Sequence, residues 1–263
     1  MAKGGVVTLA PDADAHVLAH ELAHVALGHD SDGGAHHFER SERPQIGNID
    51  EIMSEASGIA NRVSTFGMDW GSFVAAAGGN TFGTVGAGIV SAHSGGGDLR
   101  KRYLYTVRCG LIDFRHFYQL MYIGLMLSNR DAVEAGRDHE LTSEATSRFA
   151  AEDTVSNALG ALFGSQQSRL ERVATFLGNL RVFLNRCGPA DWSRMTPADQ
   201  DTVVEYYGAR NADRTPLHQN ESSTPAPPVT TTDAAAPTHG IFPFTQAIGW
   251  GNQWNMFTGT VDD

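Results

Sequence analysis

Cysteine is scarce in this chain, which has only two in 263 residues. Folds that depend on a framework of disulfide bonds contain many more, so that class of protein is excluded. Cys109 and Cys187 each lie between an arginine and a glycine. Their context fits one disulfide bond and two free thiols equally well.

Positive charge and long apolar runs are also lacking. Lys and Arg number 19 against 30 Asp and Glu, a formal net charge of −11, whereas binding to nucleic acids and anionic membranes depends on attraction to phosphate. The longest weakly polar run, 73–90, is interrupted by Gly, Asn and Thr, unlike a transmembrane helix. The first turns of the chain have no apolar segment like that of a signal peptide. We expect no nucleic acid and no membrane as partners, and a protein that is cytoplasmic or delivered by a secretion system needing no signal peptide.

Helical periodicity is what the chain has in abundance. It predicts a mainly α (α+β) protein with a short N-terminal strand or small sheet and a larger helical body. Residues 4–10 and 102–112 favour strands, and residues 30–47 favour a loop. Apolar spacing and capping residues predict helices over 13–28, 48–65, 70–77, 113–136, 150–164, 165–188 and 196–210.

The composition changes after Asn211. Residues 211–239 are rich in Pro, Thr and Ser with almost no large apolar side chains, which is typical of an extended linker. Residues 240–263 are again rich in Phe and Trp. We expect residues 1–210 to form the catalytic domain, and the aromatic tail at 240–263 to dock onto it or to bind a protein partner.

The stretch HELAHVALGH, residues 20–29, contains the pattern His-Glu-x-x-His. Residues four apart share a helix face, so His20 and His24 can offer two imidazole nitrogens to one zinc ion. Glu21 is rotated by about 100° and can accept a proton from water without binding the metal itself. The motif predicts a zinc site with Glu21 as the general base.

Two histidines need a third protein ligand to form a catalytic zinc site. The familiar extension with a third histidine fails, because Asp30 occupies that position. Glu51 and Glu55, four apart on the predicted helix 48–65, share a face. One of them is expected to bind zinc, and the other to hydrogen-bond a ligating histidine.

These segments resemble the gluzincin type of zincin metallopeptidase. HELAHVALGH and, about thirty residues later, EASGIA are similar to the two active-site helices of the compact bacterial ImmA/IrrE and antirestriction ArdC-like peptidases. The resemblance covers residues 6–66 and implies His20, His24 and Glu55 as zinc ligands, Glu21 as the catalytic base, and a protein or peptide substrate. Residues 107–117 and 147–160 resemble paired motifs of other bacterial proteins, some associated with toxin delivery, which imply no activity.

Further histidines each have two interpretations. His29 suits the end of helix 13–28 because a cation there is favoured by the helix dipole, and it is also a candidate for contact with the metal site. The candidates for stabilising an oxyanion are His36, His37 and His116, each of which also fits a solvated or packed position. The acidic residues at predicted helix starts, Asp113, Glu152 and Asp153, fit caps and first-turn positions.

The sequence therefore predicts a zinc-dependent metallohydrolase, and specifically a peptidase in which activated water attacks a peptide carbonyl. Two alternatives remain open: a toxin-like effector protease secreted into another cell, and a non-catalytic helical interaction protein stabilised by zinc. A structural zinc site has no need of Glu21 as a base, which favours an enzyme.

Overall fold

The computed structural model describes residues 2–3, 6–7, 37–77, 99–142 and 148–219. This part of the protein is mainly helical with a small sheet, as the sequence predicts. The predicted helix 13–28 and the aromatic tail lie outside it. Four predicted helices are confirmed: α2 (Ile49–Val63), α3 (Trp70–Ala76), α6 (Ala151–Ser165) and α8 (Pro197–Gly208).

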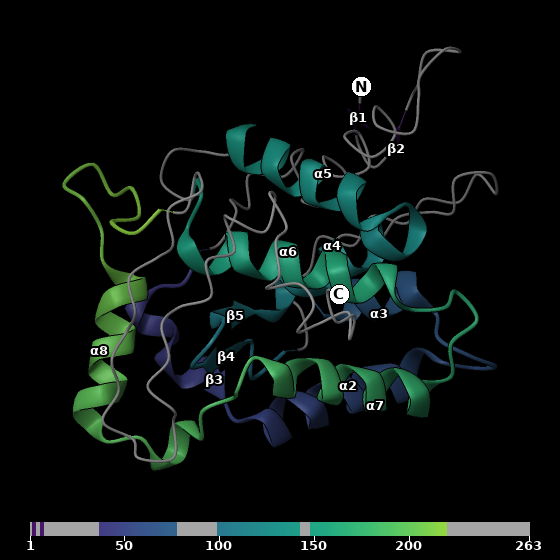
Figure 1. The fold of residues 1–263 in the computed structure, drawn as a ribbon, viewed down its shortest axis with the longest axis horizontal. Helices are drawn as coiled ribbons and strands as arrows, with labels where there is room; N and C mark the ends of the chain where they lie inside the picture. Colours follow the sequence, from purple (N-terminus) through teal and green to yellow (C-terminus); the bar gives the residue numbers. More distant parts are fainter. Residues whose placement is uncertain (1, 4–5, 8–36, 78–98, 143–147, 220–263) are drawn as a thin grey trace, which may run out of the picture.

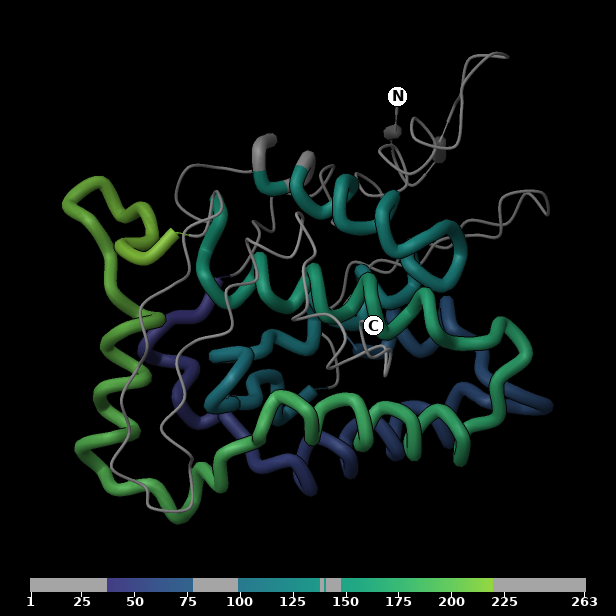
Figure 2. The backbone as a smooth tube through the Cα atoms, in the orientation of Figure 1, coloured from purple at the N-terminus to yellow at the C-terminus, as the bar shows by residue number. Residues whose placement is uncertain are grey.

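A three-stranded sheet lies between layers of helices (Figure 1). Its order is β3 (Ile46–Gly47), β4 (Tyr103–Thr106), β5 (Gly110–Asp113), with β3 parallel to β4 and β4 antiparallel to β5. Helices α4 (Phe114–Met126) and α6 lie on one side of it, and α2 and α7 (Val173–Arg186) lie side by side on the other (Figures 1 and 2). The short strands β1 (Ala2–Lys3) and β2 (Val6–Val7) form a separate antiparallel pair.

Residues 102–112, predicted as one strand, form a hairpin instead. The chain reverses between β4 and β5, where Gly110 adopts a φ of 77°, a conformation that glycine takes without steric cost. The Thr106 hydroxyl oxygen accepts a hydrogen bond from the Cys109 N–H (3.1 Å), and the hydroxyl donates to the Gly110 carbonyl (2.9 Å). These local bonds satisfy the turn, so the apolar run folds back on itself.

The prediction of a loop over 30–47 is wrong at its C-terminal end. Residues Arg40–Gln45 form a 3₁₀ helix, η1, and Ile46 and Gly47 form β3. A capping box explains the helix, because the Glu42 carboxylate accepts a hydrogen bond from the Glu39 N–H at 3.0 Å. The polar composition that favoured a loop is the composition of a helix start.

The single helix predicted over 113–136 is divided into α4 and α5 (Asn129–Thr142). Ser128 begins the second helix: its hydroxyl accepts a hydrogen bond from the Asp131 N–H (3.1 Å) and donates to the Asp131 carboxylate (2.6 Å). Such a cap competes with continuation of the preceding helix. The helix predicted over 165–188 likewise begins only at Val173. The N-terminal cap of α4, Asp113, is as predicted.

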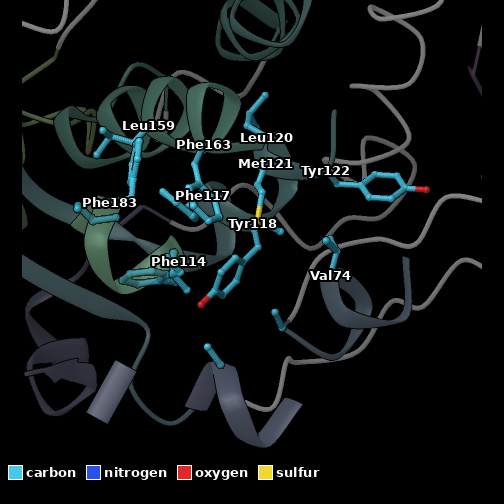
Figure 3. Close-up of a cluster of buried hydrophobic side chains, with 14 of the residues drawn as sticks. Val74, Phe114, Phe117, Tyr118, Leu120, Met121, Tyr122, Leu159, Phe163 and Phe183 are labelled. Carbon is cyan, nitrogen blue, oxygen red and sulfur yellow. The ribbon is translucent and has the colours of Figure 1, made fainter. Parts of the chain in front are cut away.

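Helices α4 and α6 are parallel and their backbones touch. A Cβ atom at Gly160 would lie 2.1 Å from the Phe117 carbonyl oxygen, and one at Gly164 would lie 1.9 Å from that of Met121. Only glycine permits this approach. Aromatic rings of α4, α6 and α7 fill the core beside the contact (Figure 3). The N-terminal ends of the two helices therefore lie together, at the same end of the pair.

Cys109 and Cys187 form a disulfide bond, which the sequence left open. The bond joins the β4–β5 turn to the C-terminal end of α7, and its Cα atoms are 5.3 Å apart. Both residues are buried in the main core. Within the described segments, none of the helices combines the length and the apolar character that a bilayer crossing requires.

Candidate functional site

The structure describes only part of the predicted zinc site. The predicted residues outside the described segments are His20, Glu21, His24, His29 and His36. Those inside are Glu51, Glu55, His37 and His116. The structure therefore describes the surroundings of the two glutamates and of two of the histidines.

The Glu51 carboxylate is engaged in interactions at the start of α2. One of its carboxylate oxygens accepts a hydrogen bond from the Asn48 N–H at 2.8 Å, which completes a capping box. The other oxygen lies 3.7 Å from the Lys101 ammonium. Glu51 is also exposed. Its two oxygens therefore have a structural role at the helix terminus.

Glu55 lies one turn further along α2 and is half-buried. Within the described part of the chain its carboxylate takes part in no hydrogen bond comparable to those of Glu51. Burial first, and the negative charge of Glu55 second, raise the pKa of the Tyr118 phenol on α4. Glu55 is therefore near enough to Tyr118 for its charge to act on the phenol.

The Tyr118 hydroxyl is buried and has no hydrogen-bond partner among the described residues. Figure 3 shows it pointing away from Leu159 and Phe163 of α6. A buried phenol without a partner is costly, because its O–H has lost water and gained nothing in return. The Tyr118 hydroxyl is thus a donor that no described residue uses.

His37 and His116 lie in the neighbourhood of a different polar cluster. His37 is half-buried and precedes Phe38, whose N–H donates to a Glu152 carboxylate oxygen at 2.7 Å. His116, on the first turn of α4, is only 4 % exposed and faces α6. Its Nδ1 lies 3.2 Å from the Asn157 side-chain oxygen, and its Nε2 lies 3.5 Å from an Asp153 oxygen. The structure thus groups His116 with α6 rather than with Glu55.

The cluster around His116 is composed mainly of buried carboxyl groups at the joined N-terminal ends of α4 and α6. Its acidic members, each 3 % exposed or less, are Asp113, Glu140, Glu152 and Asp153. Arg102 of the sheet forms a two-bonded ion pair with Asp113, donating from Nε at 2.9 Å and from Nη2. Glu140 accepts from the Phe149 N–H (2.8 Å) and from the Asn157 amide (3.2 Å).

Burial dominates the acid–base properties of these groups. It raises the pKa of Glu140 and that of Glu152 to about 7. Burial first and the charge of Glu152 second raise the pKa of Asp153 well above its usual range. For Asp113 burial acts in the same direction, but attraction to Arg102 outweighs it and lowers the pKa. Burial lowers the pKa of His116 to about 4, so its imidazole is neutral at neutral pH.

Sequence reasoning did not find this cluster. It assigned Glu152 and Asp153 to the first turn of α6, where acidic side chains complement the helix dipole, and they do occupy that turn. The pattern alone does not reveal that both are buried, because burial depends on the contact of α4 with α6. One signal was present: Asp-x-x-His and Glu-Asp-x-x-Ser-Asn each place several polar residues on an otherwise apolar helix start.

Comparison with family models, with curated proteins and with solved structures found no significant match for this chain.

Proposed function

We propose that the chain is a zinc-dependent metallohydrolase, and specifically a peptidase, with His20, His24 and Glu55 as metal ligands and Glu21 as general base. The observation that carries the proposal is the His-Glu-x-x-His motif in combination with a half-buried glutamate, Glu55, on a second helix. Glu55 is preferred to Glu51 because the oxygens of Glu51 are bonded at the start of α2.

The side chains of His20, His24 and Glu55 suit a zinc site. Two imidazoles and one carboxylate are a donor set that zinc takes in hydrolytic enzymes, and the unsatisfied Tyr118 hydroxyl is suited to hydrogen-bond the Glu55 carboxylate and hold it in position. Zinc bound in such a site would act as a Lewis acid and lower the pKa of a water molecule toward neutrality. With the metal bound, Glu21 would accept a proton from the attacking water and deliver it to the leaving amine. His36 and His37 are the candidates for stabilising the oxyanion, since His116 is enclosed against α6.

Elemental analysis of the purified protein tests the ligand assignment. His24→Ala and Glu55→Gln are each expected to lose one zinc per chain, whereas Glu51→Gln, the control one turn away, should retain it. Tyr118→Phe should weaken zinc affinity by about 10- to 100-fold, as is typical when a hydrogen-bond partner of a ligand is removed. Glu21→Gln should keep zinc but cleave no member of a peptide library. Loss of zinc in Glu51→Gln with retention in Glu55→Gln would reverse the assignment.

The disulfide bond favours a version of this proposal in which the peptidase folds in an oxidising compartment, as a secreted toxin-like effector does. Disulfides form and persist in oxidising compartments and are rare in the cytosol. The measurement that separates the two versions is peptidase activity before and after reduction. An effector of this kind should lose activity with its disulfide, whereas a cytoplasmic enzyme should be as active with two thiols.

A further inference from the structure

Asp113, His116 and Asp153 lie close enough to hold one ion in common. One donor atom from each lies within 4.8 Å of the other two. All three are buried, with 0 %, 4 % and 0 % of their surface exposed. They come from β5, α4 and α6, at the point where the N-terminal ends of the two helices meet.

The hydrogen bonds around His116 fix which of its nitrogens carries the proton. The Asn157 amide nitrogen donates to Glu140, so the Asn157 oxygen faces His116 Nδ1. An oxygen can only accept, and Nδ1 must therefore be the protonated nitrogen. This leaves Nε2 with a free lone pair. An imidazole whose Nδ1–H is held by an acceptor while Nε2 is free is in the state required of a metal ligand.

Nε2 faces an acceptor rather than a donor. The atom opposite it, at 3.5 Å, is an oxygen of Asp153. Neither oxygen of Asp153 has a hydrogen-bond partner in the described part of the chain, although both are buried. Two lone pairs that face each other in a dry interior repel, unless a proton on the Asp153 carboxyl group or a metal ion lies between them.

Asp113 has capacity left for a further partner. One of its oxygens accepts from Arg102 and from the Arg115 N–H, whereas among the described residues the other accepts from Arg102 alone. A carboxylate offers about four acceptor positions, so one remains. The positive ends of the α4 and α6 dipoles favour the ionised form of Asp113 and Asp153. Burial opposes ionisation of Asp153 and raises its pKa well above the usual range, so a bound cation has to displace the proton of this carboxyl group.

We propose that Asp113, His116 and Asp153 bind one divalent transition-metal ion, at a site separate from His20, His24 and Glu55. Two carboxylate oxygens and one imidazole nitrogen suit Zn²⁺, Mn²⁺ or Fe²⁺. Ligands at normal bond lengths to such an ion are about 3.4 Å apart, so donor atoms now up to 4.8 Å apart need to close by up to about 1.4 Å. The ion lies between Nε2 and the Asp153 carboxylate and joins the first turns of α4 and α6.

Cobalt binding to a variant without the first site provides the test. The His24→Ala protein is stripped of metal with a chelator, titrated with Co²⁺ and followed by the visible absorption of bound cobalt and by metal content after gel filtration. One Co²⁺ per chain is expected. Adding Asp153→Asn should weaken this binding by at least 100-fold. The control is Asp199→Asn, which removes a carboxylate of similar burial from α8.

The outcomes separate this site from the proposed peptidase site. If the N-terminal zinc site does not exist, His24→Ala changes nothing and Asp153→Asn still removes one ion. If the cluster binds only protons, the His24→Ala protein takes up no Co²⁺. Equal uptake with and without Asp153→Asn overturns the proposal.

A second measurement uses wild-type protein and does not depend on how a variant folds. Anomalous X-ray scattering from cobalt-loaded crystals should show a peak between Asp113, His116 and Asp153. A map of ordered side chains without that peak also overturns the proposal.

Discussion

Glu152 shows how much a single carboxyl group depends on what surrounds it. Its oxygen accepts the Phe38 N–H at 2.7 Å, a bond that joins the segment before η1 to the start of α6. The same enclosure removes its water and raises its pKa to about 7. Such a group is neutral in the folded protein at pH values where it is already ionised in the unfolded chain. Protein stability must therefore depend on pH through this residue.

We expect Glu152→Gln to reduce the pH dependence of stability in the metal-free protein. Between pH 4.5 and about 7 the folded carboxyl binds a proton that the unfolded one has released, so its contribution to the free energy of unfolding falls as the pH rises through this window. The loss is on the order of 3 kcal/mol, since each unit of pKa shift corresponds to roughly 1.4 kcal/mol. Glutamine keeps the oxygen that accepts from Phe38 and cannot ionise.

Denaturant unfolding at pH 5 and pH 8, with chelator present, measures this difference. His116 acts in the opposite direction, because its lowered pKa of about 4 makes stability rise between that value and pH 6.5. Glu140 contributes with the same sign as Glu152. The variant should therefore lose only part of the wild-type slope, and an unchanged slope would contradict the pKa assigned to Glu152.

At this scale the sequence shows which residues can share a helix face, but not what surrounds each side chain. The His-Glu-x-x-His pattern at 20–29 and the shared face of Glu51 and Glu55 can be predicted from the sequence, because helical spacing determines which residues share a face. The resemblance already implied Glu55. The structure adds that the Glu51 carboxylate accepts from the Asn48 N–H and lies near the Lys101 ammonium, which the sequence pattern does not show. The burial of Asp153 was beyond prediction for the same reason, since a neighbouring helix determines it.

Helices and strands were predictable where local signals agree. For α2 the cap at Asn48, the apolar face and the polar end all indicate one helix, which the structure confirms. The division of α4 from α5 was missed because the apolar pattern resumes directly after the short polar run 128–131. The hydrogen bonds between the Ser128 hydroxyl and Asp131 start the second helix there. The parallel pairing of α4 with α6 is a long-range feature, which periodicity in one helix cannot reveal.

The contact between α4 and α6 makes a prediction for Gly160. Gly160→Ala should lower the free energy of unfolding by about 3 kcal/mol or more, because the new methyl group would lie 2.1 Å from the Phe117 carbonyl oxygen. Alanine has the higher helix propensity, by up to about 1 kcal/mol, so packing must outweigh it.

Gly178→Ala in α7 is the matched control for that substitution. Nothing lies within 4 Å of a Cβ atom at Gly178, and there the substitution should stabilise the protein by roughly 0.5–1 kcal/mol. Denaturant unfolding compares the two variants. Similar effects at the two positions would show that α4 and α6 are further apart than the structure has them.

At the scale of the molecule, the disulfide bond connects two parts of the core that are far apart in sequence. Cys109 and Cys187 are 78 residues apart, and the chain between them includes α4, α5, α6 and α7. Closing a loop of this length restricts the unfolded chain and stabilises the folded one by about 4.5 kcal/mol.

Reduction should therefore lower the melting temperature of the protein by roughly 8–10 °C. Calorimetry with and without reductant, after mass spectrometry has verified the bond, gives the comparison. An alkylated reduced sample shows whether the effect is that of the bond itself. Two free thiols in protein unfolded without reductant would rule out the bond.

The burial of the disulfide bond limits when the bond can form or be reduced. Cys109 is 1 % exposed and Cys187 is fully enclosed, so an oxidant or a reductant reaches the sulfurs only while the turn and the end of α7 are open. Once the core has closed, the redox state changes only as fast as the protein unfolds locally. The compartment in which the chain folds therefore determines whether the disulfide forms, and the bond persists after the protein moves to another compartment.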